Sequence, residues 1–276
     1  MLHFKNAPYG RYSGNEWGKS WAWIWQGSIK ANAAWFLQEL PSFIIPVILA
    51  VDQNRTSQLT NITNAVLLCM FCAHYFHRTF IFPLLIKQGT RTPLLIFLMS
   101  FIFCSLNGYL QGCSLISCSS YPDSWTTQPR FYLGASLFFA GMAINVHSDR
   151  ILSKLRQPGE MQYKIPTGGM FTYVSGANYF GEIVEWCGFA VACWSMSGAA
   201  MALFTASNLA PRALAHHRYT TDTGLNLAPC ALAHHRYTTD TGLNLAPCAL
   251  AHHRWYIKKF AEDYPKNRKA LVPFLY

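Results

Sequence analysis

The sequence predicts an all-α fold, a polytopic transmembrane helix bundle with six spans. Of its 276 residues, 51% are hydrophobic and only 12% are charged, and the mean hydropathy is +0.13. The apolar residues gather in runs of the length that a bilayer requires, about 20 residues for each helix. Soluble domains carry roughly 25% charged residues, so this composition excludes a soluble globular enzyme.

Four apolar runs are each long enough for one span: 33–51, 64–86, 93–117 and 130–147. A fifth apolar region, 170–206, is too long for one span, because a single helix of that length would reach about 55 Å across a hydrocarbon core of about 30 Å. We expect two shorter spans there, with a turn near the Ser-Met-Ser-Gly sequence at 195–198.

The basic residues predict the orientation in the membrane. Six spans place both chain ends on one side, and that side receives sixteen Lys and Arg residues against two on the other. Because basic residues favour the cytoplasmic side, we expect a cytosolic N-terminal segment at 1–30 and a cytosolic C-terminus, with a membrane-embedded domain at 31–276. Membrane topology thus accounts for the excess of basic residues, and we expect no nucleic-acid partner. The same topology places the glycosylation sequons at Asn54 and Asn61 on the lumenal side.

A short sequence repeats almost perfectly from Asn208 onward: NLAPRALAHHRYTTDTGL, then NLAPCALAHHRYTTDTGL, then NLAPCALAHHR. Solenoid repeats start at about 20 residues and diverge between copies. The near-identity therefore indicates a tandem duplication at 219–254 without a function of its own. It also explains six of the ten histidines, and because no Cys or carboxylate recurs at ligand spacing, we predict no metal site.

Ionisable groups inside predicted spans are costly, so each is a functional candidate or a partner that holds helices together. Glu39 lies in the first span and Tyr75 in the second. A carboxyl group and a phenol that face one apolar cavity would suit the polarisation of a ligand carbonyl. Asn178, Glu182 and Glu185 share one helical face, and for all five residues pairing between helices remains the alternative. For Arg78, near the cytosolic end of its span, we favour such pairing or snorkelling.

Seven sequence blocks, taken together, resemble the steroid 5α-reductases, the 3-oxo-5α-steroid 4-dehydrogenases of types 1 and 2. They follow one another in chain order: AAWFLQELPSF (33–43), AHYFHRTF (73–80), NGYLQG (107–112), YPDSW (121–125), GMAINVHSDRIL (141–152), LRQPGEMQYKIPTGGMFTYVSGANYFGEIVEWCG (155–188) and WYIKKFAEDYPKNRKALVPFLY (255–276). The resemblance implies a seven-helix, multi-pass protein of the endoplasmic reticulum membrane. It further implies that NADPH serves to reduce the 4,5 double bond of 3-oxo-4-ene steroids such as testosterone and progesterone.

The resemblance also assigns roles to individual residues. Glu39 and Tyr75 correspond to the catalytic pair that binds the steroid 3-oxo group, and Gln38 beside them is expected to contact the substrate. The expected cofactor contacts are Asn145, Asp149, Arg156, Tyr163, Lys164, Asn178, Gly181, Glu182, Arg212, His252, Tyr256 and Arg268. The partners expected are the steroid and the lipid bilayer, with no obligate protein partner.

This chain departs from the family pattern in two places. The first of the family's seven helices, expected before 33–43, is missing, so six spans are expected. Within the repeat, either Arg212 with His216 fills the cofactor site, or His252 fills it with Cys248 where the family has an arginine. Three alternatives remain open: a related membrane reductase of enones or enoyl lipids, a catalytically inactive truncated isoform, and a transporter.

Overall fold

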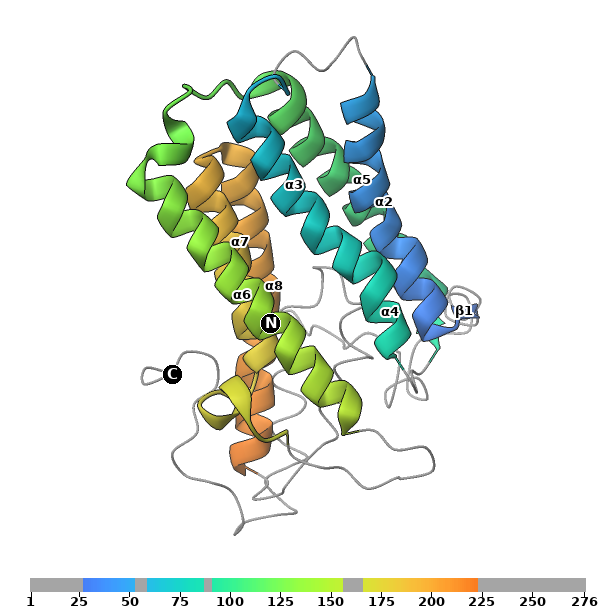
Figure 1. The fold of residues 1–276 in the computed structure, drawn as a ribbon. Coiled ribbons are helices and arrows are strands. Elements are labelled where there is room, and N and C mark those ends of the chain that lie inside the picture. Colours follow the sequence, from blue (N-terminus) through green and yellow to red (C-terminus); the bar gives the residue numbers. More distant parts are fainter. Residues whose placement is uncertain (1–26, 53–58, 87–90, 156–165, 223–276) are drawn as a thin grey trace, which may run out of the picture.

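The computed structural model describes residues 27–52, 59–86, 91–155 and 166–222, and these form a bundle of helices (Figure 1). The long helices are α2 (Ala31–Val51), α3 (Ile62–Phe76), α5 (Leu94–Cys113), α6 (Pro129–Lys154), α7 (Ala177–Cys193) and α8 (Met196–Asp222). The short elements are β1 (Ser28–Ile29), the π-helical turn η4 (His77–Ile81), α4 (Phe82–Leu85), β2 (Thr92–Pro93), the π-helical turn η5 (Ser114–Cys118), and the 3₁₀ turns η6 (Trp125–Thr127) and η7 (Gly169–Thr172). The strands pair antiparallel, Ser28 with Pro93 and Ile29 with Thr92.

Four helical segments among the described residues are long and apolar enough to cross a membrane: Ala31–Val51, Ile62–Leu85, Leu94–Cys118 and Pro129–Lys154. They coincide with the first four predicted spans, so this part of the prediction is confirmed. The chain also turns between α7 and α8 at Trp194, whose φ of 49° is left-handed, next to the predicted position at 195–198. However, α7 has only 17 residues, about 26 Å of helix, so it falls short of a full span. Six full spans are therefore not shown, although the two helices expected there are present.

Two groups of three helices make up the bundle, α2 with α3 and α5, and α6 with α7 and α8 (Figure 1). Buried aromatic rings join the groups. Phe71 of α3 contacts Trp186 and Phe189 of α7, with ring centroids 5.9 and 6.0 Å apart, and Phe138 of α6 packs against Phe189 at 6.1 Å. These four side chains are fully buried, so the core lies where α3, α6 and α7 meet.

Helices α6 and α7 touch backbone to backbone through glycines spaced seven residues apart. A Cβ atom at Gly141 would lie 2.3 Å from the backbone nitrogen of Glu185, and one at Gly181 would lie 2.5 Å from that of Asn145. Gly134 and Gly188 form the same kind of contact, with distances of 2.4 Å to their nearest backbone atoms. Small residues permit this close approach in membrane helices. As a result, polar side chains of α7 come within reach of α6.

Helices α2 and α5 are fixed against each other in a similar way. A Cβ at Gly108 would lie 2.8 Å from the carbonyl oxygen of Pro41, and the Ser42 hydroxyl donates a 2.8 Å hydrogen bond to the Cys104 carbonyl. The neighbouring helix α3 widens into η4 just before Pro83. Proline cannot donate a backbone hydrogen bond and crowds the carbonyl four residues earlier, so a local change of helix geometry is expected there.

Asn61 has a structural role at the start of α3. Its side-chain oxygen accepts a hydrogen bond from the Thr63 backbone N–H, and its amide nitrogen donates to the Tyr121 carbonyl at 2.7 Å. The Tyr121 hydroxyl in turn donates to the Cys193 carbonyl at 2.8 Å, and burial raises the pKa of this phenol to about 12. The amide nitrogen that glycosylation would modify is thus engaged in the folded chain, whereas Asn54 lies outside the described residues.

Candidate active site

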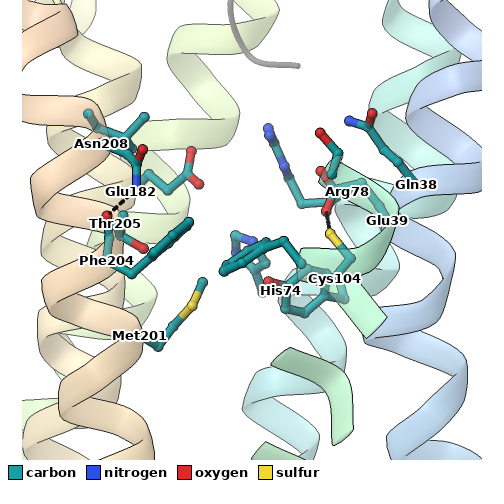
Figure 2. Close-up of a pocket in the computed structure, with 14 residues that line it drawn as sticks. Gln38, Glu39, His74, Arg78, Cys104, Glu182, Met201, Phe204, Thr205 and Asn208 are labelled. Atoms are coloured by element: carbon teal, nitrogen blue, oxygen red, sulfur yellow. Dashed lines mark hydrogen bonds between the residues drawn. The ribbon is translucent and has the colours of Figure 1, made fainter. Parts of the chain in front are cut away.

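A cavity lies between the two groups of helices (Figure 2). Its lining residues come from α2, α3, η4, α5, α7 and α8: Gln38, Glu39, His74, Tyr75, Arg78, Ser100, Phe103, Cys104, Glu182, Met201, Phe204, Thr205, Asn208 and Leu209.

Glu39 and Tyr75, the predicted catalytic pair, both line this cavity. Glu39 extends from α2 and is 9% exposed, whereas Tyr75 extends from α3 and is 3% exposed. Cys104 of α5 directs its thiol toward a Glu39 carboxylate oxygen at 3.8 Å, and the Asn107 amide donates a 2.8 Å hydrogen bond to the Tyr75 hydroxyl oxygen. The structure therefore brings together a carboxyl group and a phenol that are far apart in the sequence.

Gln38, the predicted substrate contact, also lines the cavity. Its side chain is 1% exposed, and its amide oxygen has no hydrogen-bond partner among the described residues. The side-chain oxygen of Asn208, on α8, is likewise buried and unpartnered within the described part of the chain. In Figure 2, Gln38 lies on α2 across the cavity from Asn208. Two hydrogen-bond acceptors are therefore available to a ligand.

Arg78 adds a cation to the cavity lining. Its guanidinium group lies 4.6 Å from the ring centroids of both Trp35 and Phe82, and 3.6 Å from an Asp149 carboxylate oxygen. The side chain is only 6% exposed. The expectation of pairing is confirmed, because flanking aromatic rings and the Asp149 carboxylate stabilise the charge inside the bundle.

Three of the predicted cofactor residues form one cluster between α6 and α7. The Asn145 amide donates to the Asn178 carbonyl oxygen at 3.0 Å and to a Glu182 carboxylate oxygen at 3.5 Å. Glu182 reaches from this cluster into the cavity, where Figure 2 shows it on the side of α8. At Gly181, the missing side chain makes room for α6, so the structure explains this glycine by helix packing.

Glu185 lies one turn further along α7 and has a different environment. It is completely buried, and its carboxylate contacts the His74 ring nitrogen Nδ1 at 2.7 Å. The sequence allowed a functional role or pairing between helices for the acidic residues of this face, and Glu185 pairs between helices. The cavity contains Glu182 instead.

Several predicted cofactor residues fall outside the described residues: Arg156, Tyr163, Lys164, His252, Tyr256 and Arg268. Arg212 lies within α8, where the structure describes the helix but not its side chain. The choice between Arg212 with His216 and His252 consequently remains a prediction.

Sequence reasoning missed the contribution of α5. Ser100, Cys104, Asn107 and Gln111 follow each other at intervals of four, three and four residues in an otherwise apolar helix. This helical spacing was a usable signal, because all four are buried on one face. On α8, Thr205 and Asn208 form a shorter pattern of the same kind, which the adjacent repeat obscured.

Known proteins resemble this chain along most of its length. The family described as 3-oxo-5-alpha-steroid 4-dehydrogenase matches residues 90–229 and 223–276. The mouse (Mus musculus) 3-oxo-5-alpha-steroid 4-dehydrogenase 1 is 44% identical over 275 residues, which cover 99% of this chain and 89% of the mouse protein. This chain belongs to the 3-oxo-5-alpha-steroid 4-dehydrogenase family. The human (Homo sapiens) 3-oxo-5-alpha-steroid 4-dehydrogenase 2 is 46% identical over 248 residues, or 90% of this chain and 82% of the human protein.

Membership in the 3-oxo-5-alpha-steroid 4-dehydrogenase family confirms the resemblance seen in the sequence blocks. The chain is a homologue of these oxidoreductases, and its membrane-length helices make it a multi-pass membrane protein. The two matched segments of the family overlap at 223–229, inside the repeated sequence. Relatives of both type 1 and type 2 match at 42–46% identity, so the similarity does not separate the two types.

Proposed function

We propose that this protein reduces the 4,5 double bond of 3-oxo-4-ene steroids, such as testosterone and progesterone, to give 5α-reduced 3-oxo steroids with NADPH as cofactor. The observation that supports this most directly is the placement of two buried side chains, Glu39 and Tyr75, in the lining of one cavity. The family relationship supplies the substrate class, and this pair supplies the chemistry that the substrate needs.

Glu39 and Tyr75 act on the 3-oxo group. A protonated carboxyl group and a phenol each donate one hydrogen bond, and both would be directed to the same ketone oxygen. When bound, NADPH would supply the hydride that adds to C5 of the enone. Negative charge then develops on the 3-oxo oxygen as the double bond shifts toward C3, and the two donors stabilise it in a site that excludes bulk water. A proton added at C4 completes the reduction, so that one hydride and one proton replace the 4,5 double bond.

Polar residues in and beside the cavity support the proposed cofactor. The amide oxygen of Asn208, unpartnered within the described residues, can accept a hydrogen bond from a carboxamide such as that of nicotinamide, whereas Gln38 stays the proposed substrate contact. Glu182 and its partner Asn145 offer further polar contacts from the α6–α7 side. Together with Asp149 and Asn178, and with the predicted residues beyond the described part, these residues would hold NADPH, and Gly181 would contribute by letting α6 and α7 pack closely.

The membrane explains how the two reactants would meet. A flat, apolar steroid partitions into lipid and reaches a cavity between membrane helices, whereas a charged nucleotide comes from the aqueous side. The basic loops that carry the positive-inside signal would face the cytosol, in the endoplasmic reticulum membrane. The cofactor would therefore enter from the cytosol and the steroid from the bilayer.

Conversion of radiolabelled testosterone by membranes that express the chain, with NADPH, tests this proposal. We expect 5α-reduced product from the unsubstituted chain and none from Glu39→Gln, which keeps the size of the side chain but replaces the acid. Asp123→Asn is the matched control, because it makes the same chemical change at an exposed position outside the cavity. A variant lacking 219–254 is assayed beside them. Failure of both the full chain and the shortened chain to convert any 3-oxo-4-ene steroid would contradict the proposal.

A further inference from the structure

Tyr75 has a neighbour that can control the direction of its hydroxyl hydrogen. Asn107 lies behind Tyr75, outside the cavity lining, and donates a 2.8 Å hydrogen bond from Nδ2 to the phenol oxygen. Both side chains are almost fully buried, at 6% and 3% exposure, so water does not compete for this contact.

The chemistry of a phenol makes the direction of this bond important. A tyrosine hydroxyl has one hydrogen to donate and an oxygen that can accept. When an amide N–H occupies the oxygen, the hydroxyl cannot donate back to that nitrogen, so its hydrogen goes to another acceptor, either the neighbouring Ser42 side chain or a ligand group in the cavity. Hydrogen bonds in a chain also polarise one another, so a phenol that accepts from Asn107 becomes a better donor.

Both partners are held rigidly, which keeps the bond in place. Asn107 precedes Gly108, which packs directly on the backbone of Pro41 in α2. The Tyr75 ring packs against Phe71, with centroids 4.8 Å apart, and Trp186, at 5.9 Å. The backbone beside Asn107 and the ring of Tyr75 are therefore both fixed by packing.

We propose that Asn107 is a positioning residue that fixes the hydroxyl of Tyr75 as a hydrogen-bond donor toward the substrate carbonyl. This inference rests on the proposed function, because it assigns Tyr75 the same role in polarising the 3-oxo group. It adds a residue from α5 that touches neither substrate nor cofactor and acts only through the phenol.

The test compares Asn107→Leu, which keeps the approximate shape but removes the donor, in two backgrounds. With Tyr75 present, we expect kcat for testosterone to fall at least about tenfold with little change in KM. The reason is that the hydrogen bond from the oriented Tyr75 hydroxyl strengthens mainly as negative charge develops on the 3-oxo oxygen. In the Tyr75→Phe background, the same substitution should cause no further loss, because no phenol oxygen remains to be oriented.

The matched control is Gln111→Leu, one turn further along α5. Gln111 is also buried and also donates an amide hydrogen bond, at 2.8 Å to the Ser197 carbonyl, but it does not contact Tyr75. Its replacement should lower stability while leaving kcat of the folded protein largely unchanged. An equal fall of kcat in both leucine variants would show a merely structural role and overturn the inference.

A spectroscopic readout separates positioning from folding defects. The infrared carbonyl stretch of bound testosterone labelled with ¹³C at position 3 falls in frequency as its hydrogen bonds strengthen. We expect a higher frequency in Asn107→Leu than in the unsubstituted protein, and an unchanged frequency would overturn the inference. Absence of turnover in the unsubstituted chain would instead overturn the proposed function, and this inference with it.

Discussion

His74 of α3 and Glu185 of α7 are joined by a 2.7 Å contact between Nδ1 and Oε1, where both side chains are almost fully buried. The His74 ring also meets Trp186 edge to face, with centroids 4.6 Å apart. The pair therefore connects the helix that contains Tyr75 to the helix that contains Glu182, and it holds opposite walls of the cavity in place.

Glu185→Ala should strongly destabilise the protein, because it leaves His74 buried without its partner. We expect a loss of about 1–3 kcal/mol in the free energy of unfolding, measured by thermal or denaturant unfolding in detergent micelles. Glu185→Gln keeps a hydrogen-bonding side chain of the same size and should cost much less. Equal stability of the alanine and glutamine variants would contradict a role for this contact in joining α3 to α7.

Replacement of Arg78 by lysine should impair the site although the charge is kept. The planar guanidinium packs between Trp35 and Phe82, which a compact ammonium group cannot reproduce. We expect a loss of about 1–2 kcal/mol in stability, together with a lower kcat in the testosterone assay. Arg150→Lys is the control, because Arg150 is exposed at the end of α6. If both lysine variants behave like the unsubstituted chain, aromatic packing at Arg78 has no measurable importance.

The sequence was sufficient to predict the helical segments, and it singled out Glu39 and Tyr75 as candidates, for identifiable physical reasons. Apolar runs of bilayer length leave few alternatives to a helix, because unsatisfied backbone groups are too costly in lipid. Glu39 and Tyr75 stood out because an ionisable or strongly polar group within such a run demands an explanation. Their convergence on one cavity depended on how α2 and α3 pack, which the residue pattern alone does not specify.

The partners of the buried polar groups were less predictable. His74 and Glu185 are 111 residues apart in the chain. Their contact follows from the glycine-mediated approach of α6 and α7 and the aromatic packing of α3 against α7, neither of which is a local property. The helical spacing of the polar residues on α5 could have singled out Asn107 as buried, but it gives no indication that its partner is Tyr75.

Gly181→Ala should separate α6 from α7. The new methyl group would lie 2.5 Å from the Asn145 backbone nitrogen, and a backbone atom cannot move aside as the end of a side chain can. We expect a destabilisation of about 1–3 kcal/mol, together with weaker NADPH binding, because the Asn145–Glu182 contact would be lost. At Gly112, the atom nearest to an added methyl group would be the Leu49 side-chain Cδ1, at 3.0 Å. Gly112→Ala should therefore be better tolerated. A larger loss of stability in Gly112→Ala than in Gly181→Ala would refute the backbone contact at Gly181.

Asn61 should contribute to stability through two separable hydrogen bonds. Serine is a good N-terminal cap but is too short to reach the Tyr121 carbonyl, so Asn61→Ser should remove only the link to Tyr121. Asn61→Ala removes the cap as well, and we expect it to cost about 1 kcal/mol more than Asn61→Ser. Thermal unfolding of the three proteins should rank asparagine above serine and serine above alanine. Because both substitutions abolish the sequon equally, a stability difference between them comes from the cap and not from a lost glycan, and identical melting temperatures for serine and alanine would argue against capping by Asn61.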